Sequence, residues 1–235
     1  MDVTKIGREL AIVIPAFNEE ECIAPVVRGF SSVTNAEIVV ADNNSTDSTA
    51  ALAKEAGATV VPAPHPGYGS ACLAGLSYLA HRENGPPKVV AFADGDGAND
   101  PRELSQIVEP VMSGRVELVI GSRPKRADGG SLTVPQKFGN VLACRLIQLR
   151  YGAKYSDLGP FRTISWKALE QIEMADKDYG WTVEMQVKAA KFGLRFEEVD
   201  VANYARIGGE SKVSGTIKGV FFAGTKIIST ILRHQ

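Results

Sequence analysis

The sequence predicts one α/β domain built on a doubly wound, mainly parallel sheet. Short apolar runs recur along the first half without alternating with polar residues, as strands covered on both faces do. Each run is followed by a helix-like segment, and repeated strand–helix units give parallel strands joined by crossover helices. The 235 residues, of which 44% are hydrophobic and 23% charged, suffice to build such a core.

The elements expected in the first half follow from this pattern in order. The strands are the apolar runs Leu10–Pro15, Glu37–Asp42, Thr59–Pro62, Lys88–Ala93 and Val116–Gly121. The helices between them are Glu19–Phe30, Asn44–Gly57, Gly69–Arg82 and Pro101–Ser113. The second of these helices has polar residues typical of an N-cap at its start and a glycine typical of a helix stop at its end.

After Gly121 the pattern changes. A polar loop is expected over Arg123–Pro135, a helix over Lys137–Tyr151, a strand within Leu194–Tyr204 and a helix over Thr216–Arg233. The first of these helices carries an apolar stripe of Phe138, Val141, Leu142, Leu146 and Leu149; the second carries Ile217, Val220, Phe221, Gly224, Ile227, Ile228 and Ile231. Such stripes usually face a core, but with basic flanks they also fit dimer packing or the interface of an anionic membrane.

Charge and cysteine content exclude several classes of protein. The formal net charge of −1 argues against a general nucleic-acid binder. Basic residues nevertheless outnumber acidic ones between Ser122 and Lys154 and after Val201, which predicts an anionic ligand or surface there. Three widely spaced cysteines, no apparent signal peptide and no apolar run of membrane-spanning length predict a cytoplasmic protein, soluble or peripheral at the inner face of the cell membrane.

The segment "VVAFADGDGANDP" ends an expected strand with Asp94 and Asp96, separated by one glycine. Ligands of open α/β sheets bind beyond the carboxyl ends of the strands, where Asp42 and the "GSR" of residues 121–123 are also expected. Paired carboxylates are typical ligands of Mg²⁺ or Mn²⁺ together with substrate phosphates. Gly95 and Gly97 would let a diphosphate approach closely. The alternative is a turn whose acids serve as helix caps.

Eight motifs in order resemble family 2 glycosyltransferases, and more closely the polyprenyl-phosphate sugar transferases of the dolichol-phosphate mannose synthase type. They are "IPAFNEEE", "VVADNNSTDST", "PGYGSACLAG", "DGDGANDP", "GSR", "DLGPFR", "YGWTVEMQVKAAKFG" and "YARIGGESKVSG". The resemblance runs from about Ile12 to Gly215. It implies the GT-A fold of nucleotide-diphospho-sugar transferases, with a nucleotide-sugar-binding half (1–122), an acceptor-side half (123–215) and an amphipathic C-terminal helix (216–235) in a single domain (1–235).

The resemblance also implies roles for individual residues. The residues expected around the base and ribose are Pro15, Phe17, Glu19 and Asp42. Asp94 is expected near the donor sugar and diphosphate, and Asp96 on the metal. Arg123, Arg206 and Lys212 are expected to face the diphosphate or a lipid phosphate, where Ser211 adds a hydroxyl donor. The catalytic set is therefore Asp94, Asp96, Arg206 and Lys212.

Two departures from the family pattern bear on these roles. Relatives often carry a side-chain oxygen or amide two residues after the metal-binding aspartate, where this chain has Ala98. The metal would then rely on Asn99, on another residue or on more water. Asn43 and Asn44 replace the usual Asp-Gly after the second strand, which changes the expected contacts to base and ribose.

The expected activity is an inverting, metal-dependent transfer of a hexose from a UDP- or GDP-sugar to a polyprenyl phosphate at the membrane surface. A membrane-anchoring partner protein or a homo-oligomer would fit the apolar stripes. One alternative is transfer to a soluble hydroxyl compound, with Glu184 as the base. Another is a nucleotide-sugar-binding protein without catalysis. A nucleotidyltransferase is disfavoured because no Gly-rich basic loop follows the first strand.

Overall fold

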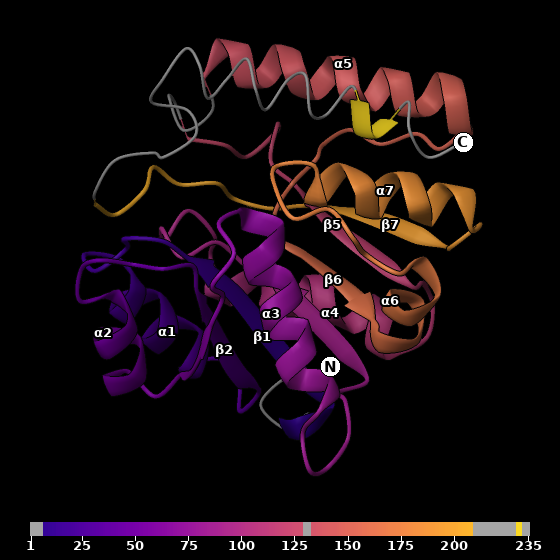
Figure 1. Cartoon of the computed structure of the whole chain (residues 1–235). Helices are drawn as coiled ribbons and strands as arrows, with labels where there is room; N and C mark the ends of the chain where they lie inside the picture. Colours follow the sequence, from indigo (N-terminus) through magenta and orange to yellow (C-terminus); the bar gives the residue numbers. More distant parts are fainter. Residues whose placement is uncertain (1–6, 129–132, 209–228, 232–235) are drawn as a thin grey trace.

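A computed structural model describes residues 7–128, 133–208 and 229–231 of the chain. Figure 1 shows a central sheet with helices on both faces. Its strands are β1 (Leu10–Ala16), β2 (Glu37–Asp42), β3 (Thr59–Pro62), β4 (Val89–Phe92), β5 (Leu118–Ser122), β6 (Arg162–Ser165) and β7 (Phe196–Asp200). The order across the sheet is β3-β2-β1-β4-β6-β5-β7, and β6 alone among these strands is antiparallel to its neighbours. The predicted doubly wound, mainly parallel sheet is confirmed.

Successive side chains of each central strand enter different cores. In β1, Ala11 and Val13 face one core, whereas Leu10, Ile12 and Ile14 face the other. The first core packs under α3 (Tyr68–Ala80), α5 (Val134–Tyr151), α6 (Trp166–Ile172) and α7 (Trp181–Lys191); the second packs under α1 (Ile23–Ser31), α2 (Thr49–Glu55) and α4 (Leu104–Met112). Burial on both faces explains why the strand sequences are apolar without alternation.

Strand β6 was not expected, because its sequence RTIS contains a single aliphatic residue. It lies between β4 and β5, so a segment of the 123–215 region completes the sheet begun by residues 1–122. Arg162 in this strand is fully buried. Its guanidinium is satisfied by the carbonyl oxygens of Leu158, Gly159 and Thr182 at 2.5–3.0 Å. These contacts compensate for burying a cation, although burial still lowers the pKa of Arg162 to about 10.

The predicted helix over Lys137–Tyr151 is present, but its face toward the protein differs from the predicted stripe. Ala143, Cys144 and Ile147 are buried. Phe138 and Leu149, by contrast, are 70% and 84% exposed. A core-facing role for the whole stripe is therefore wrong. The stripe expected over Thr216–Arg233 lies outside the described residues, except for 229–231, which are helical. In the part of the chain that the structure describes, no helix is long and apolar enough to span a bilayer.

The strands that run in the common direction bring their carboxyl ends to one edge of the sheet. At this edge, the start of α3 is pressed against the loop before α7. The amide of Ser70 donates to the carbonyl oxygen of Lys177 at 2.9 Å. A Cβ on Gly69 would lie 2.0 Å from the carbonyl oxygen of Asp176, and one on Gly67 would lie 2.1 Å from that of Lys177. Both glycines of the "PGYG" segment are thus required by backbone-to-backbone contact.

We expect Gly69→Ala to destabilise the protein by about 3 kcal/mol, because neither backbone can yield without loss of the contact. For this chain length that is a fall in Tm of roughly 6–12 °C, measurable by differential scanning calorimetry. Gly139→Ala is the matched control: Gly139 lies within α5 and a Cβ there meets nothing within 4 Å. This second change should stabilise the helix by about 0.5–1 kcal/mol. Equal effects of the two substitutions would contradict the packing argument.

Candidate active site

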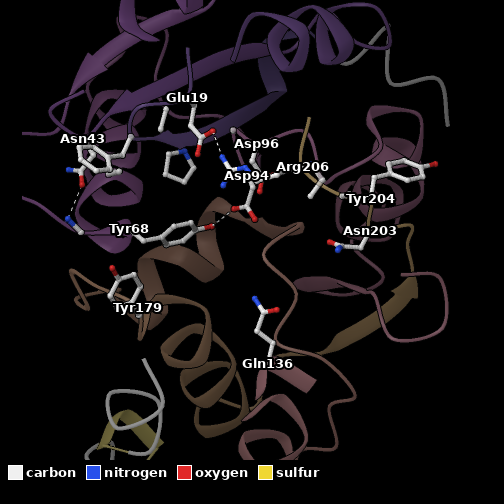
Figure 2. Close-up of a pocket in the computed structure, with 18 of the residues that line it drawn as sticks. Glu19, Asn43, Tyr68, Asp94, Asp96, Gln136, Tyr179, Asn203, Tyr204 and Arg206 are labelled. Carbon is white, nitrogen blue, oxygen red and sulfur yellow. Dashed lines mark hydrogen bonds and ion pairs between the residues drawn. The ribbon is translucent and has the colours of Figure 1, made fainter. Parts of the chain in front are cut away.

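A cleft of about 810 Å³ opens at the carboxyl edge of the sheet. It brings together seven of the residues expected in a site: Pro15, Phe17, Glu19, Asp94, Asp96, Arg123 and Arg206. Asp42 ends β2 but does not line the cleft; its carboxylate accepts a hydrogen bond from the amide of Ser45 at 3.3 Å. Ser211 and Lys212 lie outside the described residues. Figure 2 shows Asp94, Asp96 and Arg206 at the centre of the cleft.

The turn after β4 holds the two aspartates in one small volume. The amide of Asp94 donates to Oδ1 of Asn99 at 2.9 Å, and Oδ1 of Asp96 accepts from the amide of Ala98 at 3.0 Å. Gly97 has a left-handed φ of 81°, and a Cβ there would meet the side chain of Ile207 at 2.4 Å. Glycine is therefore required at 97 by backbone conformation and by packing against the protein's own chain.

The carboxylate pair has the electrostatics of a cation site. Burial and, next, the neighbouring Asp96 carboxylate raise the pKa of Asp94 to about 7. A cation bound between the two groups would relieve this repulsion. In the described residues no group of three or more Asp, Glu, His or Cys side chains could hold a metal. The pair thus fits a divalent ion that takes its remaining ligands from substrate phosphates and water, as Mg²⁺ sites commonly do.

Asn99 is not arranged as a metal ligand, although it follows the alanine at the position where relatives carry an oxygen or amide. It is 5% exposed, and its Oδ1 holds the amide of Asp94 at the end of β4. Its amide nitrogen is buried without a hydrogen-bond partner among the described residues. The side chain therefore shapes the aspartate turn.

Arg206 is held in the cleft by two partners, the carboxylate of Glu19 and the carbonyl oxygen of Gly208. One of its terminal nitrogens lies 2.5 Å from Oε2 of Glu19, and its Nε donates to the carbonyl oxygen of Gly208 at 2.7 Å. The carboxylates of Glu19 and Asp96 both raise the pKa of the guanidinium against the effect of its burial. Glu19 is thus engaged with a cation beside the aspartates, an arrangement that its expected position around the ribose did not include.

Arg123 is held from behind by Asp157, the first residue of the "DLGPFR" motif. The guanidinium makes a bidentate pair with this fully buried carboxylate, at 2.7 and 2.9 Å. Asp157 also accepts from the backbone amide of Arg123 at 2.9 Å. Such a fork fixes the direction of the arginine at the wall of the cleft.

Asn43 and Asn44 close the opposite end of the cleft. Nδ2 of Asn43 donates to the carbonyl oxygens of Ala63 and His65 at 2.9 and 2.7 Å, and its Oδ1 accepts from the amide of Gly67. Asn44 adopts a left-handed φ of 62° and donates to the carbonyl oxygen of Pro64. The two amides that replace the usual Asp-Gly therefore tie β2 to the loop that leads into α3.

Glu184 does not line the cleft. Its buried carboxylate accepts from the amides of Ala175 and Asp176, the latter at 2.7 Å, and pairs with Lys188 at 2.9 Å. The loop that it holds is the one that contacts Gly67 and Gly69 at the start of α3. This geometry suits a positioning residue, and a direct base role for Glu184 has no support in it.

Sequence reasoning missed several polar cleft residues, among them Tyr68, Gln136, Tyr179 and Asn203. The hydroxyl of Tyr68 donates to Oδ1 of Asp94 at 3.3 Å, so the "PGYG" segment contributes a polar contact as well as a turn. The position of Tyr68 between two glycines at the start of a helix was a signal that could have identified it as a cleft residue. Tyr179 begins the motif "YGWTVEMQVKAAKFG" but was given no role. No local pattern distinguished Gln136, in α5, or Asn203, in the segment after β7.

The chain resembles known glycosyltransferases in sequence. An uncharacterised glycosyltransferase of Mycobacterium tuberculosis is 36% identical over 217 residues, which cover 92% of this chain and 95% of that protein. An undecaprenyl-phosphate mannosyltransferase of Micrococcus luteus is 29% identical over 223 residues, which cover 88% of each chain.

Its fold resembles that of a solved enzyme. Glucosyl-3-phosphoglycerate synthase from Mycobacterium tuberculosis, crystallised with Mn²⁺, UDP and glucosyl-3-phosphoglycerate, superposes with a TM-score of 0.75 at 22% identity, covering 99% of this chain and 81% of that one. That likeness confirms the GT-A type of fold. The model of the family described as glycosyl transferase family 2 matches residues 11–172. The chain therefore belongs to glycosyl transferase family 2 and is a glycosyltransferase.

Proposed function

We propose that this enzyme transfers a hexose, with inversion, from a UDP- or GDP-sugar to the phosphate of a polyprenyl lipid. The observation that carries the proposal is the meeting of the Asp94–Asp96 pair with Arg206 in one cleft large enough for a nucleotide-sugar. Support for the donor class comes from the fold's likeness to an enzyme crystallised with UDP. Support for the lipid acceptor comes from the relative that is an undecaprenyl-phosphate mannosyltransferase.

The donor would lie along the cleft with its nucleoside near Pro15, Phe17 and Asn43 and its diphosphate beside the aspartates. Asp96 and Asp94 would hold Mg²⁺ or Mn²⁺, which supplies charge neutralisation of the leaving diphosphate. Arg206 would stabilise the negative charge that develops there as the glycosidic bond breaks. Glu19 keeps this guanidinium oriented before the donor arrives. Lys212 and Ser211 are proposed to contact a phosphate by the family resemblance.

A phosphate acceptor suits a cleft in which Glu184 is not available as a base. A lipid phosphate is ionised near neutral pH and needs no proton removed before it attacks. The enzyme must chiefly align it with the sugar and offset the repulsion between the two anions. A hydroxyl acceptor would instead require a carboxylate base. In the proposed complex the cleft carboxylates are already engaged, Glu19 by Arg206 and the two aspartates by the metal.

The outer face of α5 gives the lipid a route to the cleft. Thr133 and Gln136 at the start of α5 line the cleft, while Phe138, Val141 and Leu149 along the helix are at least half exposed. The basic residues Lys137, Arg145 and Arg150 are also exposed on this helix. Apolar side chains flanked by cations favour the surface of an anionic membrane, so the enzyme would act at the cytoplasmic face with α5 against the lipid.

The metal and the donor base can be identified by thermal unfolding with UDP or GDP, with and without Mn²⁺. At about 100 times its Kd, a ligand adds roughly 2.7 kcal/mol of stability, which is several degrees in Tm here. We expect a Mn²⁺-dependent shift that EDTA removes and that Asp96→Asn abolishes. Glu83→Gln, an exposed acid outside the cleft, serves as the control and should keep the shift. Absence of a shift with either nucleotide in the wild-type protein would refute the donor assignment.

Removal of the Arg206 cation should impair turnover more than folding. We expect Arg206→Met to lower kcat by about 100-fold or more, because a preorganised charge beside the leaving group is lost. Glu19→Gln, which leaves the cation in place, should have a smaller effect. Arg115→Met removes a surface arginine paired with Glu197 and is the matched control. If Arg115→Met reduces kcat as strongly as Arg206→Met, the role assigned to Arg206 is wrong.

Membrane engagement can be measured as transfer of sugar to polyprenyl phosphate in anionic vesicles. The double change Phe138→Ser and Leu149→Ser should reduce transfer about ten-fold or more without lowering Tm, since both side chains are largely exposed. Phe192→Ser removes a partly exposed aromatic at the end of α7 and should have little effect. Undiminished transfer by the double variant, or transfer only to soluble hydroxyl compounds, would overturn the lipid assignment.

A further inference from the structure

Asn203 has a side-chain amide that the protein itself does not use. The residue is 5% exposed and lines the cleft. No hydrogen bond to this amide exists among the described residues, although the side chains of Asn43 and Asn140 each make hydrogen bonds with the protein. Because the rest of the residue is buried, its amide can find hydrogen-bond partners only in the cleft, and its retention at this position points to a ligand there.

The backbone around Asn203 is held by hydrogen bonds on both sides, which fixes where its side chain leaves the main chain. Its carbonyl oxygen accepts from the amide of Asp128 at 2.9 Å, in the loop after β5. The amide of the next residue, Tyr204, donates to the carbonyl oxygen of Ala98 at 3.0 Å, on the aspartate turn. Figure 2 shows the polar ends of Asn203 and Gln136 turned toward the same space beside Asp94.

The position of this amide along the cleft indicates which part of a donor it would meet. Asn43 lies at the opposite end of the cleft from Asn203, with Asp94 and Asp96 between them (Figure 2). If the nucleoside occupies the Asn43 end and the diphosphate lies at the aspartates, the transferred sugar extends toward Asn203. A neutral amide both donates and accepts hydrogen bonds, which matches a sugar hydroxyl; a phosphate is matched better by a guanidinium.

We propose that Asn203 recognises a hydroxyl group of the transferred hexose and thereby selects the donor sugar. This assignment rests on the proposed function, because it takes the cleft to hold a nucleotide-sugar. A site built to hydrogen-bond a hydroxyl discriminates strongly against a sugar that lacks it in that orientation, because the buried amide is then left unpaired. Asn203 thus distinguishes hexose epimers, and the residues at the aspartate turn bind the diphosphate that all such donors share.

The test compares the affinity of a nucleoside diphosphate alone with that of its hexose conjugates, by calorimetry in Mn²⁺ without acceptor. Asn203→Ala should leave the Kd of UDP or GDP within about two-fold. It should raise the Kd of the preferred nucleotide-sugar by about 10- to 100-fold, the loss typical of a buried hydrogen bond to a ligand. The ratio between the Kd values of its epimers and the Kd of the preferred nucleotide-sugar should shrink by the same factor.

Retained binding of the nucleoside diphosphate also shows that the variant is folded. Asn140→Ala is the matched control: this amide joins α5 to the carbonyl oxygen of Ser156 and the amide of Leu158, outside the cleft. It should lower Tm and leave the ratio of the two affinities unchanged.

The possible outcomes separate this proposal from the proposed function. If Asn203→Ala loses affinity equally for the nucleoside diphosphate and the nucleotide-sugar, or loses affinity for neither, the proposed role of Asn203 is overturned. Failure of the wild-type protein to bind any nucleoside diphosphate would instead refute the proposed function on which it rests.

Discussion

The confinement of two carboxylates at the end of β4 is the constraint around which the cleft is built. Burial and mutual repulsion already hold the pKa of Asp94 well above its ordinary value. The surrounding groups reduce this unfavourable charge: Arg123 contributes a cation and Tyr68 a hydroxyl donor. The site is thus preorganised for positive charge, and a divalent ion with an incoming diphosphate completes it.

The groups that act on this pair are themselves held by residues outside the cleft. Arg123 is directed by the buried Asp157, whose carbonyl oxygen in turn accepts from Gln186 at 3.0 Å. Tyr68 is placed by the start of α3, which packs on the loop that Glu184 holds. The motifs "DLGPFR" and "WTVEMQ" therefore support the chemistry from a distance, because side chains in a site keep their geometry only if a second layer fixes them.

The asymmetry of the two faces connects the cleft to the proposed acceptor. One face of the sheet is covered by α1, α2 and α4, which pack directly on the strands. On the other face α5 buries Ala143, Cys144 and Ile147 and presents larger apolar residues outward. The helix is attached to the protein through these three side chains, while Phe138 and Leu149 stay exposed and would be available to the proposed lipid. The start of the same helix lies at the cleft, so one helix carries both cleft residues and the exposed apolar residues.

By itself the sequence determined the order of strands and helices up to residue 122, the two aspartates at a strand end and the family, because these depend on local patterns and on motifs in a set order. Strands Glu37–Asp42 and Thr59–Pro62 were predicted with their observed bounds. The tertiary structure decided the rest: the insertion of β6, the outward face of α5, the engagement of Glu184 and Glu19 with other chain segments, and the placement of Asn203. Each of these depends on contacts between residues far apart in the chain, and hydrophobic periodicity carries no information about which distant groups will pair.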